Sequence, residues 1–109
     1  MTTKKKYSTN RIFVFKAKKS LGQNFLINPG ILDKIIAAAE LDKNDTVIEI
    51  GPGTGVLTKK LAEQAGRIIA VDKDRRLIEG LKEKFKNTNV DLIEGDILIL
   101  DVGELIENS

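Results

Sequence analysis

A glycine-rich segment between two apolar runs holds the residues best suited to chemistry in this sequence. From residue 49 to residue 55 it reads Glu-Ile-Gly-Pro-Gly-Thr-Gly, and it separates a β-branched run from a helical pattern. Glycines there let the backbone turn tightly and approach a ligand, and the following helix offers unpaired N–H groups. Gly51, Gly53 and Gly55 are therefore predicted to form a ligand-binding loop, with a tight turn that binds nothing as the alternative.

The spacing of these glycines narrows the kind of ligand. A dinucleotide-binding loop has the pattern G-x-G-x-x-G, whereas this segment has G-x-G-x-G, and no Gly-Lys-Ser/Thr follows as in a P-loop. Glu49, at the end of the preceding run, would also repel a pyrophosphate. S-adenosylmethionine fits better, because it carries an ammonium and a sulfonium and no phosphate. We therefore expect Glu49 and the glycines to lie beside S-adenosylmethionine.

Two further carboxylates follow the next two apolar runs. Asp72 ends one of them, where a doubly wound fold brings an acid to the hydroxyls of a ribose. Asp74 is the alternative for that role, but an Asp just before a helical pattern is more typical of an N-cap. Asp96 follows the next run, and we expect its carboxylate to accept from an adenine amine while the Ile97 N–H faces a ring nitrogen. A solvated turn at Asp96 is the alternative.

The elements that must position these residues alternate between helix and strand. The expected helices cover residues 29–40, 56–65 and 75–86, and the expected strands cover 46–50, 67–72 and 90–94. Asn28 is expected to cap the first helix, and Gly66 is expected to end the second in a left-handed conformation. This order predicts an α/β fold with a right-handed parallel β-α-β-α-β unit, in which the three strand ends meet at one edge.

The composition excludes several other kinds of chemistry. The 109 residues include no Cys and no His, which removes disulfides, thiolate nucleophiles, imidazole catalysis and most zinc sites, so no metal is expected. No apolar run approaches the roughly 20 residues that span a bilayer, and no segment resembles a signal peptide. We therefore expect a cytoplasmic protein without a membrane partner.

The charges are unevenly distributed, although the net charge is only +2. The first 20 residues hold seven Lys and Arg and no acid, which leaves 11 basic and 16 acidic residues in the remainder. Residues 1–19 are therefore expected to form a basic arm outside the domain. RNA phosphates suit such an arm, and a solvated terminus is the alternative.

Residues 18–26, Lys-Lys-Ser-Leu-Gly-Gln-Asn-Phe-Leu, precede the first helix, and the glycine loop follows it. Over residues 18–101 this order resembles the rRNA adenine N6-dimethyltransferases, which act in small-subunit ribosome maturation or in macrolide resistance. The glycine loop occurs in many class I methyltransferases, but the segment from Leu21 to Leu26 is characteristic of this family. The resemblance implies a Rossmann-like class I fold and S-adenosylmethionine-dependent N6-dimethylation of adenosines in rRNA, with small-subunit maturation preferred over resistance.

The resemblance also implies roles for individual residues. Asn24 and Leu26 would contact the methionine end or the adjoining part of the cofactor. Gln23 and Asn24 carry groups suited to an amino acid, with a polar turn as the alternative. The residues expected to bind the cofactor are then Gln23, Asn24, Leu26, Glu49, Gly51, Gly53, Gly55, Asp72, Asp96 and Ile97. Lys18 and Lys19 are expected to bind rRNA in the small subunit.

The family also carries an Asn-Leu-Pro-Tyr-like motif after its fourth strand, which holds the target adenine. The sequence reaches Ser109 before any such motif, so no catalytic residue is assigned. Residues 20–109 are expected to be the N-terminal, cofactor-binding part of the methyltransferase domain, inactive alone. The alternatives are a non-catalytic RNA-binding module and a class I methyltransferase with a non-RNA substrate.

The order of strands in class I methyltransferases has a further consequence. The first strand is flanked by the second on one side and by the fourth on the other, and a fourth strand is not expected here. Strand 46–50 would then present an unpaired apolar edge, which predicts that the chain is a segment of a longer protein, self-associates or is only marginally folded.

Overall fold

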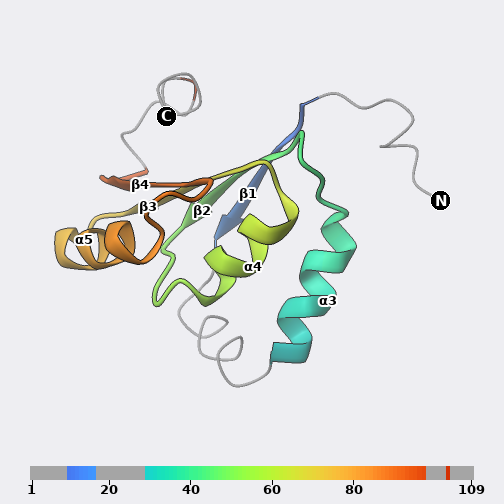
Figure 1. Cartoon of the computed structure of the whole chain (residues 1–109), viewed down its shortest axis with the longest axis horizontal. Coiled ribbons are helices and arrows are strands. Elements are labelled where there is room, and N and C mark those ends of the chain that lie inside the picture. Colours follow the sequence, from blue (N-terminus) through green and yellow to red (C-terminus); the bar gives the residue numbers. More distant parts are fainter. Residues whose placement is uncertain (1–9, 17–28, 98–102, 104–109) are drawn as a thin grey trace.

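In the described part of the chain, four parallel strands form a sheet with helices between them. The computed structural model describes residues 10–16, 29–97 and 103. The strands lie in the order β1 (Ile12–Lys16), β2 (Thr46–Ile50), β3 (Arg67–Asp72) and β4 (Val90–Glu94). The helices are α3 (Pro29–Ala39), α4 (Val56–Gln64) and α5 (Arg75–Lys84). Figure 1 shows the strands side by side with the three helices below them.

The expected alternation of strands and helices is confirmed. Strands β2, β3 and β4 have the predicted bounds and pair in parallel. The helices end one or two residues before their expected ends, which is ordinary because terminal turns fray. Asn28, the expected cap of α3, lies outside the described residues. The predicted Rossmann-like β-α-β-α-β unit therefore extends from β2 to β4.

The main core lies between the sheet and the three helices. Successive strand residues point to opposite faces, so alternate residues of each strand meet the helices. The buried members of this cluster are Leu32, Ile36, Val47, Leu57, Leu61, Ala65, Ile68, Leu81, Phe85 and Val90. On the opposite face, Ile48, Ile69 and Val71 form a second buried cluster. Burial on both faces explains why the central strands are almost continuously apolar.

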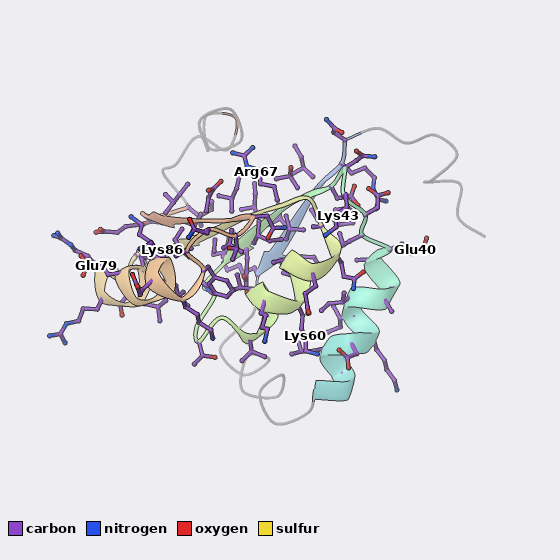
Figure 2. All side chains as sticks on the ribbon, in the orientation of Figure 1. Glu40, Lys43, Lys60, Arg67, Glu79 and Lys86 are labelled. Carbon is purple, nitrogen blue, oxygen red and sulfur yellow. The ribbon has the colours of Figure 1, made fainter. Side chains whose placement is uncertain are left out.

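Charged side chains surround this core. Figure 2 shows Glu40, Lys43, Glu79 and Lys86 on the outside of the ribbon, and all four are exposed. Among the helices that the structure describes, none has the length and apolarity needed to cross a membrane.

Strand β1 corrects two expectations. Residues 1–19 are predicted to lie outside the domain, and β2 is predicted to have an unpaired edge. Instead, β1 pairs in parallel with β2, from Ile12 opposite Thr46 to Lys16 opposite Ile50. The described part of the expected arm therefore belongs largely to the sheet, and β2 is a central strand. The self-association predicted from a free β2 edge loses its basis.

The alternating pattern of β1 explains why this segment joins the sheet. Phe13 and Phe15 are half-buried and pack against the helix-side core. Ile12 and Val14 point to the other face and are 53% and 61% exposed. Two aromatic side chains on one face of a short extended run give it apolar area to bury beside β2.

A partly buried ion pair anchors the start of β1. Asp45 is 1% exposed, and each of its carboxylate oxygens accepts a hydrogen bond from Arg11 at 3.1 Å. Arg11 also donates to the carbonyl oxygen of Glu40 and lies 4.4 Å from the ring centroid of Phe13. The Thr46 N–H donates to the Arg11 carbonyl oxygen at 2.9 Å, next to the β1–β2 ladder. The two-point pair fixes the guanidinium orientation and so helps to hold β1 in register.

Gly66 has a packing role instead of the expected left-handed cap. Helix α4 is followed by Ala65 in an extended conformation, and Gly66 is not among the residues with positive φ. A Cβ atom at Gly66 would lie 2.1 Å from the carbonyl oxygen of Lys43. The Gly66 N–H also donates to the Asp45 carbonyl oxygen at 3.0 Å. Glycine is therefore required because the chain entering β3 passes close against the turn before β2.

Candidate functional site

A cavity opens at the carboxyl ends of all four described strands. Its volume is about 240 Å³, and it is lined by Lys16, Ile50, Gly51, Val71, Asp72, Lys73, Gly95, Asp96 and Ile97. Ligands of open α/β folds bind at this edge of the sheet. The volume is below the roughly 300–1,000 Å³ of typical small-molecule pockets. The cavity is therefore the candidate ligand site, and its described lining encloses less space than a typical small-molecule pocket.

Four of the residues predicted from the sequence line this cavity. They are Gly51, Asp72, Asp96 and Ile97, from the ends of β2, β3 and β4. Two backbone hydrogen bonds of 2.9 Å extend the sheet pairing into the loops, from Gly51 N–H to the Val71 carbonyl oxygen and from Gly95 N–H to that of Asp72. The expected convergence of three strand ends is confirmed, and contact of these residues with a ligand stays a prediction.

The glycine loop adopts a backbone conformation that side chains disfavour. Gly51, Gly53 and Gly55 have φ values of +74°, +58° and +86°. At Gly55 a Cβ atom would also lie 2.9 Å from the Phe85 ring and 3.0 Å from Leu81, so α4 begins close against α5. Gly51 lines the cavity, whereas Gly53 and Gly55 are not part of its lining. Ligand contacts of the latter two stay predictions.

Asp72 and Asp74 have different positions in the structure. Asp74 Oδ1 accepts hydrogen bonds from the N–H groups of Arg76 at 3.0 Å and Leu77 at 3.2 Å, so the predicted N-cap of α5 is confirmed. Asp72 is half-buried and lines the cavity, and its Oδ1 accepts from the Asp74 N–H at 2.8 Å. That bond orients the Asp72 carboxylate, which favours Asp72 over Asp74 as the acceptor for ligand hydroxyls.

Glu49 occupies the helix side of the sheet instead of the cavity lining. Its side chain is 2% exposed, and Oε1 accepts a hydrogen bond of 2.5 Å from the Thr58 hydroxyl. Burial raises the pKa of Glu49 to about 7, against the opposing effect of the Thr58 hydrogen bond. The carboxyl therefore links the end of β2 to the first turns of α4 across the glycine loop. Its contact with a cationic ligand stays a prediction.

Five lining residues were not predicted from the sequence, namely Lys16, Ile50, Val71, Lys73 and Gly95. Four of them adjoin a predicted residue in the sequence, at the ends of β2, β3 and β4. Including the residues on either side of each predicted residue would therefore have found them. Lys16 could have been found only by recognising Ile12–Lys16 as a strand.

The remaining predicted site residues lie outside the described residues. They are the proposed methionine-end residues Gln23, Asn24 and Leu26, and the proposed RNA-binding residues Lys18 and Lys19.

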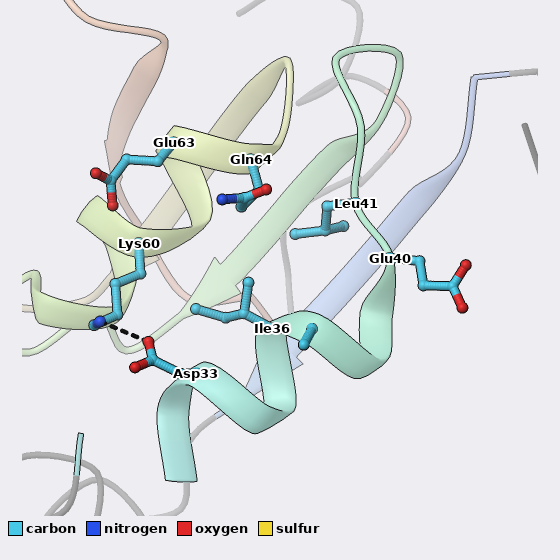
Figure 3. Close-up of a pocket in the computed structure, with 8 residues that line it drawn as sticks. Asp33, Ile36, Glu40, Leu41, Lys60, Glu63 and Gln64 are labelled. Carbon is cyan, nitrogen blue, oxygen red and sulfur yellow. Dashed lines mark hydrogen bonds and ion pairs between the residues drawn. The ribbon is translucent and has the colours of Figure 1, made fainter. Parts of the chain in front are cut away.

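A larger cavity lies between α3 and α4, away from the strand ends, and measures about 310 Å³. Figure 3 shows Asp33 and Lys60 facing each other across it, joined by an ion pair of 2.7 Å, while Glu40 points outward. Ile36 and Leu41 contribute apolar lining. None of the residues predicted to bind a ligand lines this cavity, and its lysine is paired within the chain. The strand-end cavity is therefore the candidate functional site.

Comparison with known proteins decides the family. A family model described as "Ribosomal RNA adenine dimethylase" matches residues 14–109. The chain belongs to this family. The matched range contains every residue that lines the strand-end cavity, from Lys16 to Ile97. The family resemblance inferred from the segments around Leu21 and Gly51 is thus confirmed.

Similar members of the ribosomal RNA adenine dimethylase family carry the name ribosomal RNA small subunit methyltransferase A. The one from Dehalococcoides mccartyi is 53% identical over 95 residues, and the one from Clostridium botulinum is 50% identical over 97 residues. The matched segments cover 86% and 88% of this chain but 33% and 35% of those relatives. The chain therefore spans about a third of the length of the curated relatives it matches.

Solved structures of rRNA methyltransferases share the fold. The 23S rRNA methyltransferase ErmE matches with a TM-score of 0.63 and 32% identity, covering 68% of this chain and 31% of that one. A dimethyladenosine transferase from Plasmodium falciparum matches with a TM-score of 0.62 and 44% identity, covering 68% and 28%. The Rossmann-like fold expected from the resemblance is therefore the fold of this dimethylase family member.

Proposed function

We propose that this chain is the S-adenosylmethionine-binding part of an enzyme that dimethylates N6 of adenosines in ribosomal RNA. The observation that carries the proposal is the cavity at the carboxyl ends of the strands, because it combines Gly51 of the glycine loop with two carboxylates from separate strands. The names of relatives such as that from Dehalococcoides mccartyi favour small-subunit RNA as the substrate.

The residues of the cavity fit the chemical groups of the cofactor. A carboxylate that ends a strand accepts from both hydroxyls of a ribose, which is the role we assign to Asp72. Asp96 would accept from the adenine amine, and the Ile97 N–H would donate to a ring nitrogen. Ile50 and Val71 give the cavity apolar lining suited to the adenine ring. Gln23, Asn24 and Leu26 are proposed for the methionine end.

The proposed chemistry requires little from acid or base side chains. The cofactor, when bound, would supply a methyl group on a positively charged sulfur, and transfer of that methyl group to N6 would leave the electron pair of the C–S bond on sulfur and release a proton from N6 to solvent. The residues of this chain would hold the donor in place and orient it, which is the larger part of the catalytic task in such a displacement. A chain without Cys or His can therefore take part in this reaction.

The experiment that tests this function is a calorimetric titration of the 109-residue chain with S-adenosylmethionine, S-adenosylhomocysteine and NAD⁺. We expect the two sulfur compounds to bind and NAD⁺ to bind far more weakly, because its pyrophosphate adds two negative charges near Asp72 and Asp96. Preferential binding of NAD⁺, or failure of S-adenosylmethionine to bind, overturns the proposal.

RNA binding is proposed for Lys18 and Lys19, in a cytoplasmic setting. Each phosphate contact contributes about one unit to the slope of log affinity against log salt concentration. Replacing both residues by Gln should therefore lower that slope by about two for a small-subunit rRNA fragment. An unchanged slope removes these two residues from the proposed RNA contact and leaves the cofactor assignment untouched.

A further inference from the structure

Lys16 brings a positive charge to the candidate cofactor site from an unexpected strand. It is the last residue of β1, opposite Ile50 in the β1–β2 ladder, and it lines the same cavity as Gly51. Figure 1 shows β1 lying alongside β2. The Lys16 side chain is exposed, and no hydrogen bond or ion pair joins that side chain to another described residue.

The order of the strands sets the direction in which a bound ligand must extend. On the proposed function, the adenine lies at Asp96 after β4 and the ribose lies at Asp72 of β3. The next positions along the edge of the sheet are Gly51 after β2 and then Lys16 of β1. Three strand spacings of about 4.8 Å separate β4 from β1, or about 14 Å in all. That distance suits a nucleoside joined to an amino acid, so the methionine portion would point toward Lys16.

The charges along this edge differ from one end to the other. The lining has two carboxylates, Asp72 and Asp96, at the end where the adenosine is placed. The two cations in the described lining are Lys73, which directly follows Asp72, and Lys16, at the β1 end. The methionine portion carries a carboxylate, which is repelled by the acidic end and attracted by a cation at the other end.

From this arrangement we propose that Lys16 binds the α-carboxylate of the methionine portion of S-adenosylmethionine. This assignment rests on the proposed function, which supplies the position of the adenosine. Lys16 is then a binding residue that distinguishes ligands with this carboxylate from otherwise identical ligands without it. The contact is a charge-assisted hydrogen bond made by an exposed side chain, so its effect on affinity is moderate.

The test compares two ligands that differ only in the carboxylate, S-adenosylmethionine and its decarboxylated form. Their dissociation constants are measured by calorimetry for the parent chain, Lys16→Ala, Lys16→Arg and the matched control Lys73→Ala. We expect Lys16→Ala to weaken binding of S-adenosylmethionine about fivefold and to leave binding of the decarboxylated form unchanged. Lys16→Arg should retain most of the difference between the ligands, and Lys73→Ala should affect both ligands alike.

The possible results separate the two proposals. If Lys16→Ala weakens both ligands equally, or neither, the carboxylate assignment is overturned while the cofactor site stands. If Lys16→Ala instead changes only the salt dependence of RNA binding, Lys16 contacts phosphate and the assignment is likewise wrong. If the parent chain binds neither sulfonium ligand, the proposed function fails, and the role of Lys16 fails with it. Circular dichroism spectra of the variants confirm that the exposed substitutions leave the fold intact.

Discussion

The two ends of the parallel sheet use polar residues in opposite ways. At the amino ends, the residues just before the four described strands bond within the chain; they are Arg11, Asp45, Gly66 and Asn89. Asn89 Nδ2 donates to two carbonyl oxygens at the end of α4, at 2.9 and 3.1 Å, and Arg11 donates to a carbonyl oxygen at the end of α3. At the carboxyl ends, Lys16, Gly51, Asp72 and Asp96 line a cavity.

Helix direction explains this difference. Each helix returns antiparallel to the strands, so its last carbonyl groups arrive at the amino edge and its first N–H groups arrive at the carboxyl edge. Carbonyl groups need donors, which side chains such as Arg11, Lys43 and Asn89 supply from the same chain. At the carboxyl edge Asp74 caps the first N–H groups of α5, whereas α4 begins without a side-chain cap beside the glycine loop, where a ligand can use its N–H groups. Substitutions at the amino edge should therefore change stability, and substitutions at the carboxyl edge should change binding.

The largest expected effect is on stability at the amino edge. In Gly66→Ala the added Cβ would lie 2.1 Å from the Lys43 carbonyl oxygen, so one of the two backbone segments must move. We expect a loss of roughly 4 kcal/mol in the free energy of unfolding, at the high end for single substitutions. Urea denaturation measures it. The control is Gly80→Ala in α5, where nothing lies within 4 Å and Ala should stabilise the helix by about 0.5–1 kcal/mol. If the two variants have the same free energy of unfolding, the chain at Gly66 does not pass close to the Lys43 carbonyl oxygen.

The ion pair at the start of β1 should give the next largest effect. Asp45→Ala removes the partner of Arg11, which is only a third exposed, and the expected loss is about 3 kcal/mol, at the low end for a buried pair. Asp33→Ala, which breaks the exposed pair with Lys60, should cost less than about 1 kcal/mol. Under conditions in which each variant is folded, its affinity for S-adenosylmethionine should equal that of the parent chain. A large loss of affinity in Asp45→Ala would contradict the expectation that residues at the amino edge affect stability and not binding.

Glu49 sharpens the comparison because it stands near the carboxyl edge yet points into the helix-side core. Burial raises its pKa from 4.5 to about 7, so between these values the folded chain holds a proton that the unfolded chain has released. The stability that this proton contributes is complete below pH 4.5 and is lost as the pH rises through about 7. Glu49→Gln keeps an acceptor for Thr58 without the charge.

The variant Glu49→Gln should therefore match the parent at low pH and exceed its stability above pH 7 by at most roughly 3 kcal/mol, from about 1.36 kcal/mol per pKa unit. Urea denaturation of both proteins at several pH values between 4 and 8 checks the trend. A stability difference that does not change with pH would show that the pKa of Glu49 is the same in the folded and the unfolded chain.

The last prediction compares Asp72 with Asp74, at the end of β3 and the start of α5. One variant should change ligand affinity, and the other should change stability only slightly. Asp72→Ala should lower affinity for S-adenosylmethionine about tenfold, the effect of losing a charged hydrogen bond. Asp74→Ala should leave affinity unchanged but destabilise α5 by about 1 kcal/mol, because the N-cap is lost. Calorimetry and urea denaturation on both variants give the two readouts. If Asp74→Ala loses as much affinity as Asp72→Ala, the assignment of the ribose to Asp72 is wrong.

Much of the fold and part of the site follow from local patterns. The bounds of β2, β3 and β4 could be predicted because each is a β-branched apolar run between turn-forming residues. Once a parallel sheet is inferred, the residues after those strands must share an edge, so the sequence pattern is enough to place Gly51, Asp72 and Asp96 together. The cap role of Asp74 also depends only on its neighbours in sequence.

Other features depended on contacts between distant segments. The pattern of Ile12–Lys16 is too short to identify its partner, and only the edge of β2 made it a strand and brought Lys16 to the cavity. The direction of the Glu49 side chain depended on which face α4 covers, and the role of Gly66 depended on the path of the turn at Lys43. Local hydrogen bonding and hydrophobic periodicity are encoded residue by residue, so the sequence alone determined the strands, helices and glycine loop. Pairing at a sheet edge and steric contact between loops arise only when the chain is folded, so the tertiary structure decided which charges face the site.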